Sequence, residues 1–303
     1  MVNSTIEQHI IPGHLSLREG SVDLPVLDID SDLATATIQL QGGHVTAWQP
    51  KGTEPVIFTS SRAIFQPGVP IRGGIPICWP WFNNHESDQE KPVHGFARST
   101  LWNVKESRQN PDDSVTLTLG LNDNLDFQTL WPHAFDLELK ITVGAELEVE
   151  LVHHNISQES VTITAALHTY FNVGHINNVK ISGLDGASYI DKVDMYRTKI
   201  QHGDVIVAEE TDRIYQNTTA DCVIEDALLS RKIRIKKSGS NSTVVWNPWI
   251  EKADQLKDLA DNEYESFICI ETANAGNDRV TLEPGRRHSL IAVISMEPLK
   301  PAN

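Results

Sequence analysis

Glu271 is the first residue whose type and setting could do chemistry. It ends an apolar run that begins at Phe267, and strand alternation places Phe267, Cys269 and Glu271 on one face. A carboxylate at the end of an apolar strand face is partly desolvated, which raises its pKa and makes it a better base. A strand-end glutamate turned to solvent is the alternative, and the residues alone leave both interpretations open.

Two histidines and an aspartate could accompany that carboxylate. His168 falls on one strand face with Ala166 and Tyr170, and imidazole both donates and accepts protons near pH 7 without a large perturbation. His94 has the same capacity, and Asp212 could hold a ligand hydroxyl. Structural, hydrogen-bonded histidines and a simple loop acid are the alternatives. No HxH or HExxH spacing occurs, so metal chemistry on histidine is unsupported.

Arg72 and Arg98 lie in two loop-like segments without acidic residues, 55–85 and 91–105, and Arg62 shares the first segment. In an acidic chain these segments are the places where a local positive potential can form. The planar fork of a guanidinium binds two phosphate oxygens at once, and glycines beside both arginines permit close approach of the backbone. Pairing of each arginine with a surface carboxylate is the alternative.

Composition excludes several classes of protein. The 303 residues hold 25 Lys and Arg against 41 Asp and Glu, which gives a net charge of −16, so the overall field opposes binding to nucleic acid or an anionic membrane. Three cysteines without a CxxC pair predict neither a disulfide framework nor a zinc–cysteine site. The first residues lack a basic and apolar leader, and no apolar stretch is long enough to span a membrane. A cytoplasmic protein is the expectation.

Period-two alternation of apolar residues dominates the chain. It is clear at 36–40 and 115–121, and again at 137–151, where Gly144-Ala145 joins two runs into a predicted β-hairpin. Further strands are predicted at 161–169, 232–236, 243–246, 266–271 and 289–296. The best helical pattern, 253–259, is short. Many short antiparallel strands favour an all-β fold, a large sandwich or barrel, and we expect one domain over residues 1–303.

Five motifs, taken together and in order, resemble one family. They are RGGIPICWPWF (72–82), HGFARS (94–99), ALHTYFNVG (166–174), TDRIY (211–215) and CIETA (269–273). The chain is similar to the bacterial hexose-6-phosphate mutarotases, or glucose-6-phosphate 1-epimerases, a branch of the aldose 1-epimerase superfamily. The resemblance runs from about Leu40 to Met296. Each motif alone is weak, whereas the ordered set is specific.

The resemblance implies a fold and a reaction. The fold is a large antiparallel β-sandwich of the galactose-mutarotase type, with few short helices. The reaction is the interconversion of the α and β anomers of an aldohexose 6-phosphate, glucose 6-phosphate being the expected substrate. By motif match, Glu271 corresponds to the catalytic base of the family and His168 to its general acid.

The resemblance also implies how the substrate is held. Arg72 and Arg98 correspond to substrate-binding arginines, Asp212 to a substrate-contacting acid, and His94 to a second histidine that the wider superfamily uses near the sugar ring. A small-molecule sugar phosphate is the expected partner, with no nucleic acid or membrane and with no metal or organic cofactor. A monomer is compatible with the sequence, which does not fix the oligomeric state.

Three other functions compete with this one. Mutarotation of free aldoses occurs in the wider superfamily, but the two arginine motifs speak against it. A non-catalytic sugar-phosphate-binding protein on the same fold would lack the glutamate or the histidine, and both are present. A glycosidase or lyase needs paired carboxylates, and nothing in the sequence sets a distance between Asp212 and Glu271.

Overall fold

The computed structural model describes residues 6–123 and 127–299. The very start of the chain, residues 1–5, on which the expected lack of a leader partly rests, lies outside the described residues. Almost all regular structure in these ranges is antiparallel β-sheet, as the alternating pattern predicts. Among the described residues, no helix has the length and apolar character needed to cross a membrane.

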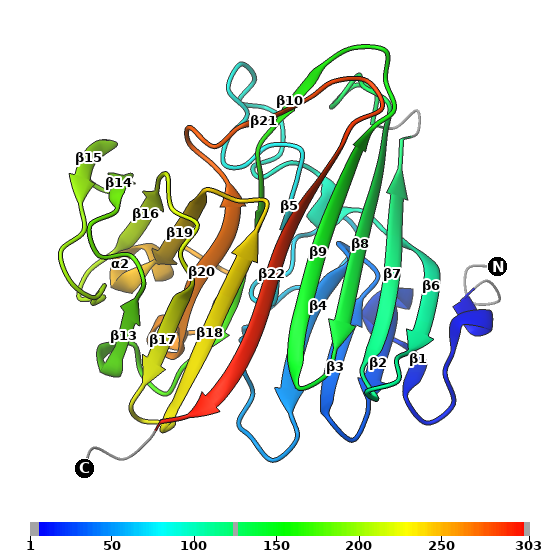
Figure 1. Ribbon diagram of the computed structural model, residues 1–303, viewed down its shortest axis with the longest axis horizontal. Helices are drawn as coiled ribbons and strands as arrows, with labels where there is room; N and C mark the ends of the chain where they lie inside the picture. The colour runs from blue at the N-terminus through cyan, green and yellow to red at the C-terminus, as the bar shows by residue number, and fades with distance from the viewer. Residues whose placement is uncertain (1–5, 124–126, 300–303) are drawn as a thin grey trace.

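One sheet, the front sheet, spans the width of the molecule (Figure 1). Its eight strands are, in spatial order, β13 (Val179–Ser182), β17 (Cys222–Asp226), β18 (Arg231–Ser238), β22 (Arg287–Pro298), β9 (Glu146–Asn155), β8 (Phe135–Val143), β7 (Val115–Asn122) and β6 (Asn103–Gln109). The predicted hairpin over 137–151 is confirmed as β8 and β9, with Val143 opposite Leu147 beside the turn. The strands predicted at 115–121, 232–236 and 289–296 are confirmed as β7, β18 and β22.

A second sheet, the back sheet, lies behind part of the front sheet (Figure 1). Its strands are, in spatial order, β15 (Arg197–Ile200), β14 (Ser188–Asp191), β16 (Thr211–Tyr215), β19 (Ser242–Asn247), β20 (Phe267–Asn274), β11 (Ala165–Leu167) and β5 (Ile77–Cys78), and β12 (Tyr170–Asn172) also pairs with β20. The strands predicted at 243–246 and 266–271 are therefore confirmed as β19 and β20.

Smaller elements complete the fold. A four-stranded sheet contains β1 (Leu15–Glu19), β2 (Pro25–Asp30), β3 (Ala34–Gln39) and β4 (His44–Pro50), and β10 (Val161–Ile163) pairs with β21 (Val280–Leu282). The α-helix α2 covers Trp249–Ala253. The 3-10 helices are η1 (Glu7–His9), η2 (Ser21–Asp23), η3 (Ala97–Ser99), η4 (Ile176–Asn178) and η5 (Glu263–Ser266).

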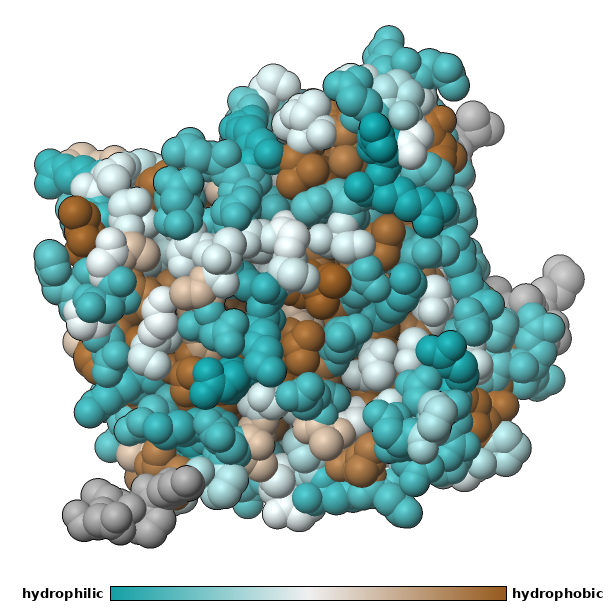
Figure 2. Space-filling view, viewed as in Figure 1, coloured by the Kyte–Doolittle hydropathy of each residue, from teal (hydrophilic) through white to brown (hydrophobic). Residues whose placement is uncertain are grey.

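The apolar core lies between the front sheet and the sheets behind it. Alternate side chains of β8 point inward, and Leu137, Leu139 and Ile141 are fully buried there. Each such side chain contributes about 1.5–3 kcal/mol relative to an exposed position. The opposite face of the front sheet is largely hydrophilic (Figure 2). The front sheet thus places apolar side chains in the core and polar side chains in solvent along the same strand.

The strand predicted over 161–169 is interrupted. It forms β10 and β11, with Thr164 between them, and the chain leaves the sheet at His168 before β12 begins. The amide of Thr164 donates to the carbonyl of Pro80, and the amide of His168 donates to that of Pro76. Loop carbonyls therefore replace the neighbouring strand as partners, which frees His168 from a regular strand position.

The best helical pattern of the sequence, over 253–259, does not form one helix. Helix α2 ends at Ala253, and successive turns follow, in which the amide of Leu256 donates to Ala253 and the amide of Leu259 to Leu256. Leu259 still packs with Tyr264 in an apolar cluster behind the back sheet. The apolar spacing of this segment thus reflects burial of separate turns and not one face of a helix.

Candidate active site

The outer face of the back sheet, turned away from the core, lines a pocket of about 470 Å³. Strand register sets Asp212 of β16 opposite Trp246 of β19, and Glu271 of β20 opposite Val244 of β19. Because residues two apart share a face, Asp212, Trp246 and Glu271 point to the same side of the sheet. A pocket of this size fits a small-molecule ligand.

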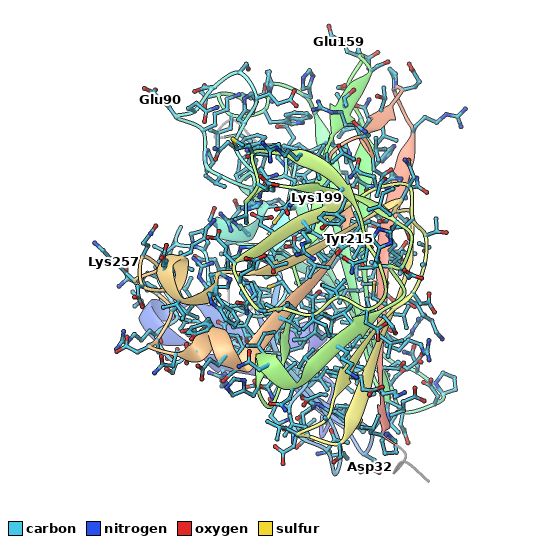
Figure 3. The ribbon with its side chains drawn as sticks, turned by 90° about the vertical axis from the view of Figure 1, so that its left-hand side faces the viewer. Asp32, Glu90, Glu159, Lys199, Tyr215 and Lys257 are labelled. Atoms are coloured by element: carbon cyan, nitrogen blue, oxygen red, sulfur yellow. The ribbon has the colours of Figure 1, made fainter. Side chains whose placement is uncertain are left out.

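All six site residues predicted from the sequence line this one pocket: Arg72, His94, Arg98, His168, Asp212 and Glu271. Loop residues join the sheet residues here, among them Asn83 and Leu256. Figure 3 shows the segments that carry Glu90 and Lys257 projecting from the same side of the molecule. The structure thus gathers side chains from distant parts of the chain around one cavity.

Glu271 lies within β20 rather than at the end of a strand, because β20 continues to Asn274. Its side chain is 1% exposed, and its Oε2 has no hydrogen-bond partner among the described residues. Burial, helped by the Asp212 carboxylate, raises the pKa of Glu271 well above its ordinary value, although Lys192 and Arg98 oppose the shift. The alternative of a solvent-facing glutamate is therefore wrong.

His168 faces Glu271 across the pocket floor, with 3.3 Å between His168 Nε2 and Glu271 Oε1. Its ring stacks on Tyr170, with ring centroids 5.0 Å apart, and meets Trp246 edge-on. Burial, followed by the charges of Arg98 and Arg72, lowers the pKa of His168 well below its ordinary value. The lowered pKa favours the neutral imidazole.

The pKa values of Glu271 and His168, which lie in contact, are shifted in opposite directions. Burial thus favours the protonated form of Glu271 and the neutral form of His168. Catalysis by one acid and one base requires one proton on the pair, whichever of the two residues carries it. The arrangement can therefore accept a proton at one oxygen and release one at another.

Arg72 is fixed by its loop and by two side chains. Its Nη1 donates to the Tyr170 hydroxyl at 3.1 Å, and its Nη2 lies 3.2 Å from Asp258 Oδ2. The next residue, Gly73, has φ +104°, and a Cβ there would lie 2.4 Å from the backbone of Thr59. Although its own loop has no acidic residue, the surroundings of Arg72 are thus not free of them, because Asp258 from a distant part of the chain pairs with it.

Arg98 lies in η3 after a glycine that a larger residue could not replace. A Cβ on Gly95 would lie 2.0 Å from the carbonyl oxygen of Trp79. Arg98 Nη2 donates to the Val93 carbonyl at 2.7 Å, and its Nε has no partner in the described part of the chain. Arg62, in contrast, forms an exposed ion pair with Asp261 at 2.8 Å, which is the alternative outcome for a surface arginine.

Asp212 and His94 also line the pocket. Asp212 is buried, which raises its pKa, while the ammonium of Lys192, 2.7 Å from Asp212 Oδ2, lowers it. His94 Nδ1 accepts a hydrogen bond from the Asn83 amide at 3.1 Å, so the neutral ring carries its proton on Nε2. Burial, with Arg98 next in importance, lowers the pKa of His94 well below its ordinary value.

Sequence reasoning missed several residues of the pocket. Lys192 is a single charged residue in an unremarkable segment, and Trp246 has no distinguishing neighbour. Asp258, which pairs with the pocket residue Arg72, was missed for the same reason as Lys192. Strand alternation alone could have placed Trp246 on the outer face of β19. Among residues 6–123 and 127–299, no group of three or more His, Cys, Asp and Glu side chains is arranged to hold a metal ion.

The fold and the pocket agree with the comparisons to known proteins. The family model described as aldose 1-epimerase matches residues 25–295, which is most of the chain. The chain therefore belongs to the aldose 1-epimerase family. This membership makes it an epimerase or mutarotase of carbohydrates and accounts for the antiparallel sandwich.

Two similar proteins carry a more specific name than the family does. A protein of Salmonella typhimurium named "Putative glucose-6-phosphate 1-epimerase" is 38% identical over 274 residues, covering 89% of this chain and 91% of the relative. A protein of Escherichia coli K12 with the same name is 38% identical over 263 residues, covering 86% of this chain and 87% of the relative.

Solved structures agree on the fold. The crystal structure of "a putative mutarotase (YeaD)" from Salmonella typhimurium superposes with a TM-score of 0.89 at 35% identity, covering 96% of each chain. A galactose mutarotase-like protein from Clostridium acetobutylicum has a TM-score of 0.73 at 16% identity, covering 94% of this chain and 99% of that one. The second similarity supports the fold alone.

Proposed function

We propose that this protein interconverts the α and β anomers of an aldohexose 6-phosphate, with glucose 6-phosphate as substrate. The observation that carries the proposal is the buried contact between Glu271 and His168 in a pocket that also contains Arg72 and Arg98. The names of the Salmonella and Escherichia relatives support the same substrate. Glu271 acts as base and His168 as acid in the direction of ring opening.

Binding of the phosphate prepares the acid. The positive charges of Arg98 and Arg72 contribute to lowering the pKa of His168. A phosphate dianion held by both guanidinium groups offsets those charges, so the pKa of His168 rises. The same anion also raises the pKa of Glu271, which Arg98 lowers, but His168 responds to both arginines. In this proposal the proton of Glu271 therefore passes to His168, which leaves a carboxylate beside an imidazolium. Phosphate recognition is in this way coupled to the chemical step.

Ring opening moves one proton from the sugar to Glu271 and one proton from His168 to the sugar. Glu271 accepts the proton of O1, and the electron pair of that O–H bond forms the C1=O1 double bond. The C1–O5 bond breaks, and O5 takes the proton of the His168 imidazolium. Rotation about C1–C2 presents the other face of the aldehyde to O5. Closure runs the same transfers backwards, and each transfer contributes roughly 10²–10⁴ in rate.

The phosphate has to displace an internal anion. Asp258 already lies 3.2 Å from Arg72 Nη2, while Arg98 contacts only a backbone carbonyl among the described residues. We therefore assign the first phosphate contact to Arg98, and the second to Arg72 after Asp258 gives way. At physiological salt the net charge of −16 is screened beyond about 8 Å, so these short contacts dominate.

Mutarotation of free aldoses is the second candidate. The Asp258–Arg72 ion pair favours it, because a guanidinium with an anionic partner has less need of a phosphate. Exchange between the anomers, measured by NMR on glucose 6-phosphate and on glucose at equal concentration, separates the two. Faster catalysed exchange of glucose 6-phosphate supports the proposal, whereas equal or faster exchange of glucose supports the second candidate.

A further inference from the structure

Lys192 lies in the pocket wall between two elements that it joins. It follows β14, and its backbone amide donates to the carbonyl of Asp212 at 2.9 Å. Its Nζ lies 2.7 Å from Asp212 Oδ2 and donates to Asn83 Oδ1 at 3.1 Å. The side chain is 17% exposed. Backbone and side chain of one residue thus fix Asp212 twice.

The contact to Asn83 extends this connection to His94. The Asn83 amide donates to His94 Nδ1 at 3.1 Å, and the His94 amide returns a hydrogen bond to the Asn83 carbonyl at 2.8 Å. Lys192 therefore connects the carboxylate on β16 with the loop that orients the His94 ring. An ammonium has three protons, and these two contacts leave one for an oxygen of a bound sugar.

Four charged or titratable groups face Asp212 from the surrounding elements. They are Lys192 after β14, Lys252 of α2, Glu210 before β16 and Glu271 of β20. Burial, then Glu210, favours protonation of Asp212, and the two lysines oppose it. Lys252 itself pairs with Glu210 at 3.0 Å. Lys192 is thus the cation in direct contact with the aspartate.

We propose that Lys192 is a positioning residue, which keeps Asp212 ionised and clamped to the Asn83 loop so that the carboxylate can receive a sugar hydroxyl. This role rests on the proposed mutarotation and adds to it a further residue of the same pocket. A buried carboxylate without its cation protonates at a higher pH and then donates where it should accept. Loss of Lys192 therefore disturbs recognition of the sugar before it disturbs folding.

The test uses the pH profile of anomer exchange in the full chain. In Lys192→Gln, which keeps an N–H donor but no charge, we expect kcat/KM for glucose 6-phosphate to fall roughly tenfold or more, the scale of a misplaced substrate contact. We expect the acid limb of the profile to move to higher pH, because the pKa of Asp212 rises. Lys192→Arg should keep the limb in place. Lys252→Gln, which removes the other lysine near Asp212, is the matched control.

A double variant separates charge from packing. Adding Asp212→Asn to Lys192→Gln removes the titrating carboxylate, so the acid limb should return to its wild-type position even though activity stays low. An acid limb that does not move in Lys192→Gln, or that moves equally in Lys252→Gln, overturns the role of Lys192. If wild-type protein itself does not accelerate exchange, the proposed function fails instead. Binding of 1,5-anhydroglucitol 6-phosphate tests the role without turnover. Weaker binding by Lys192→Gln, but not by Lys252→Gln, supports the role of Lys192.

Discussion

The two eight-stranded sheets use their outer faces in opposite ways. On the front sheet, outward charges such as Lys140 and Glu150 pair at 3.3 Å in partly exposed positions, where such pairs contribute little stability. On the back sheet, Glu271 and Asp212 are buried with pKa values raised by that burial. The same alternation thus produces a solvated surface on one sheet and a set of desolvated, reactive groups on the other.

This difference means that the buried carboxyl groups on the outer face of the back sheet lower the stability of the fold. A buried carboxyl with an unpartnered oxygen costs free energy that an apolar side chain would not. The front sheet has no comparable cost at β8, whose inward side chains are apolar. Substitutions on the two outer faces should therefore affect activity and stability differently. Four experiments test this difference.

The largest effect is expected on the Glu271–His168 pair. Glu271→Gln and His168→Asn should each lower kcat for glucose 6-phosphate by roughly 10²–10⁴, the contribution of general acid–base catalysis. Because the two residues share one proton, the double variant should lose little more than either single variant. Additive losses would contradict a shared proton. Lys140→Met on the front sheet is the control and should leave exchange unchanged.

The next effect concerns the arginines. Arg98→Ala removes a charge-assisted contact of about 1.5–3 kcal/mol, so KM for glucose 6-phosphate should rise roughly 10–100-fold. Exchange of free glucose should change far less. Arg62→Ala, at an exposed ion pair outside the pocket, is the matched control. Steady-state NMR exchange measures both sugars, and an equal loss for both would remove the phosphate role.

The pH dependence of stability should also distinguish the two sheets. The folded state raises the pKa of Glu271 above its ordinary value of 4.5, so it binds the proton more tightly than the unfolded state. Stability from this group is complete below pH 4.5 and declines as the pH rises toward the folded-state pKa, by at most about 1.4 kcal/mol per pH unit.

Glu271→Gln removes that decline. Urea unfolding of the variant should show a stability advantage over wild type that grows as the pH rises above about 5 toward the folded-state pKa of Glu271. Glu150→Gln on the front sheet should show no such trend. A constant difference between wild type and Glu271→Gln across this range would mean that burial does not perturb Glu271.

The smallest effect is expected at Asp258. Asp258→Asn removes the internal anion on Arg72, so KM for glucose 6-phosphate should fall by a few-fold, the scale of a partly exposed ion pair. Asp261→Asn frees Arg62 instead and should leave KM as it is. A rise in KM in Asp258→Asn would show that Asp258 helps to hold the substrate.

The sequence predicted much of the fold because local alternation controls it. The hairpin β8–β9 follows directly from its apolar residues, and the shared face of Phe267, Cys269 and Glu271 is confirmed. The helical pattern over 253–259 did not form one helix, and its apolar residues instead join a cluster with Tyr264 and with Phe58, which is distant in the sequence and which local spacing does not reveal.

The site was predicted in part, for a different reason. The motifs supplied six residues that the structure gathers in one pocket, while the contacts among them depend on distant pairings. Lys192 with Asp212 and Arg72 with Asp258 join segments that no sequence pattern connects. The raised pKa of Glu271 was predicted from its apolar strand face, whereas the lowered pKa of His168 was not, because it depends on burial and on the nearby arginines in the finished fold.

The central claim is that Glu271 and His168 exchange protons with the two oxygens of one hemiacetal. Exchange of magnetisation between the anomeric C1 protons of glucose 6-phosphate, with wild type and with folded Glu271→Gln, tests it most directly. We expect clear acceleration by wild type and exchange near the uncatalysed rate with the variant. Equal acceleration by both proteins would contradict the claim.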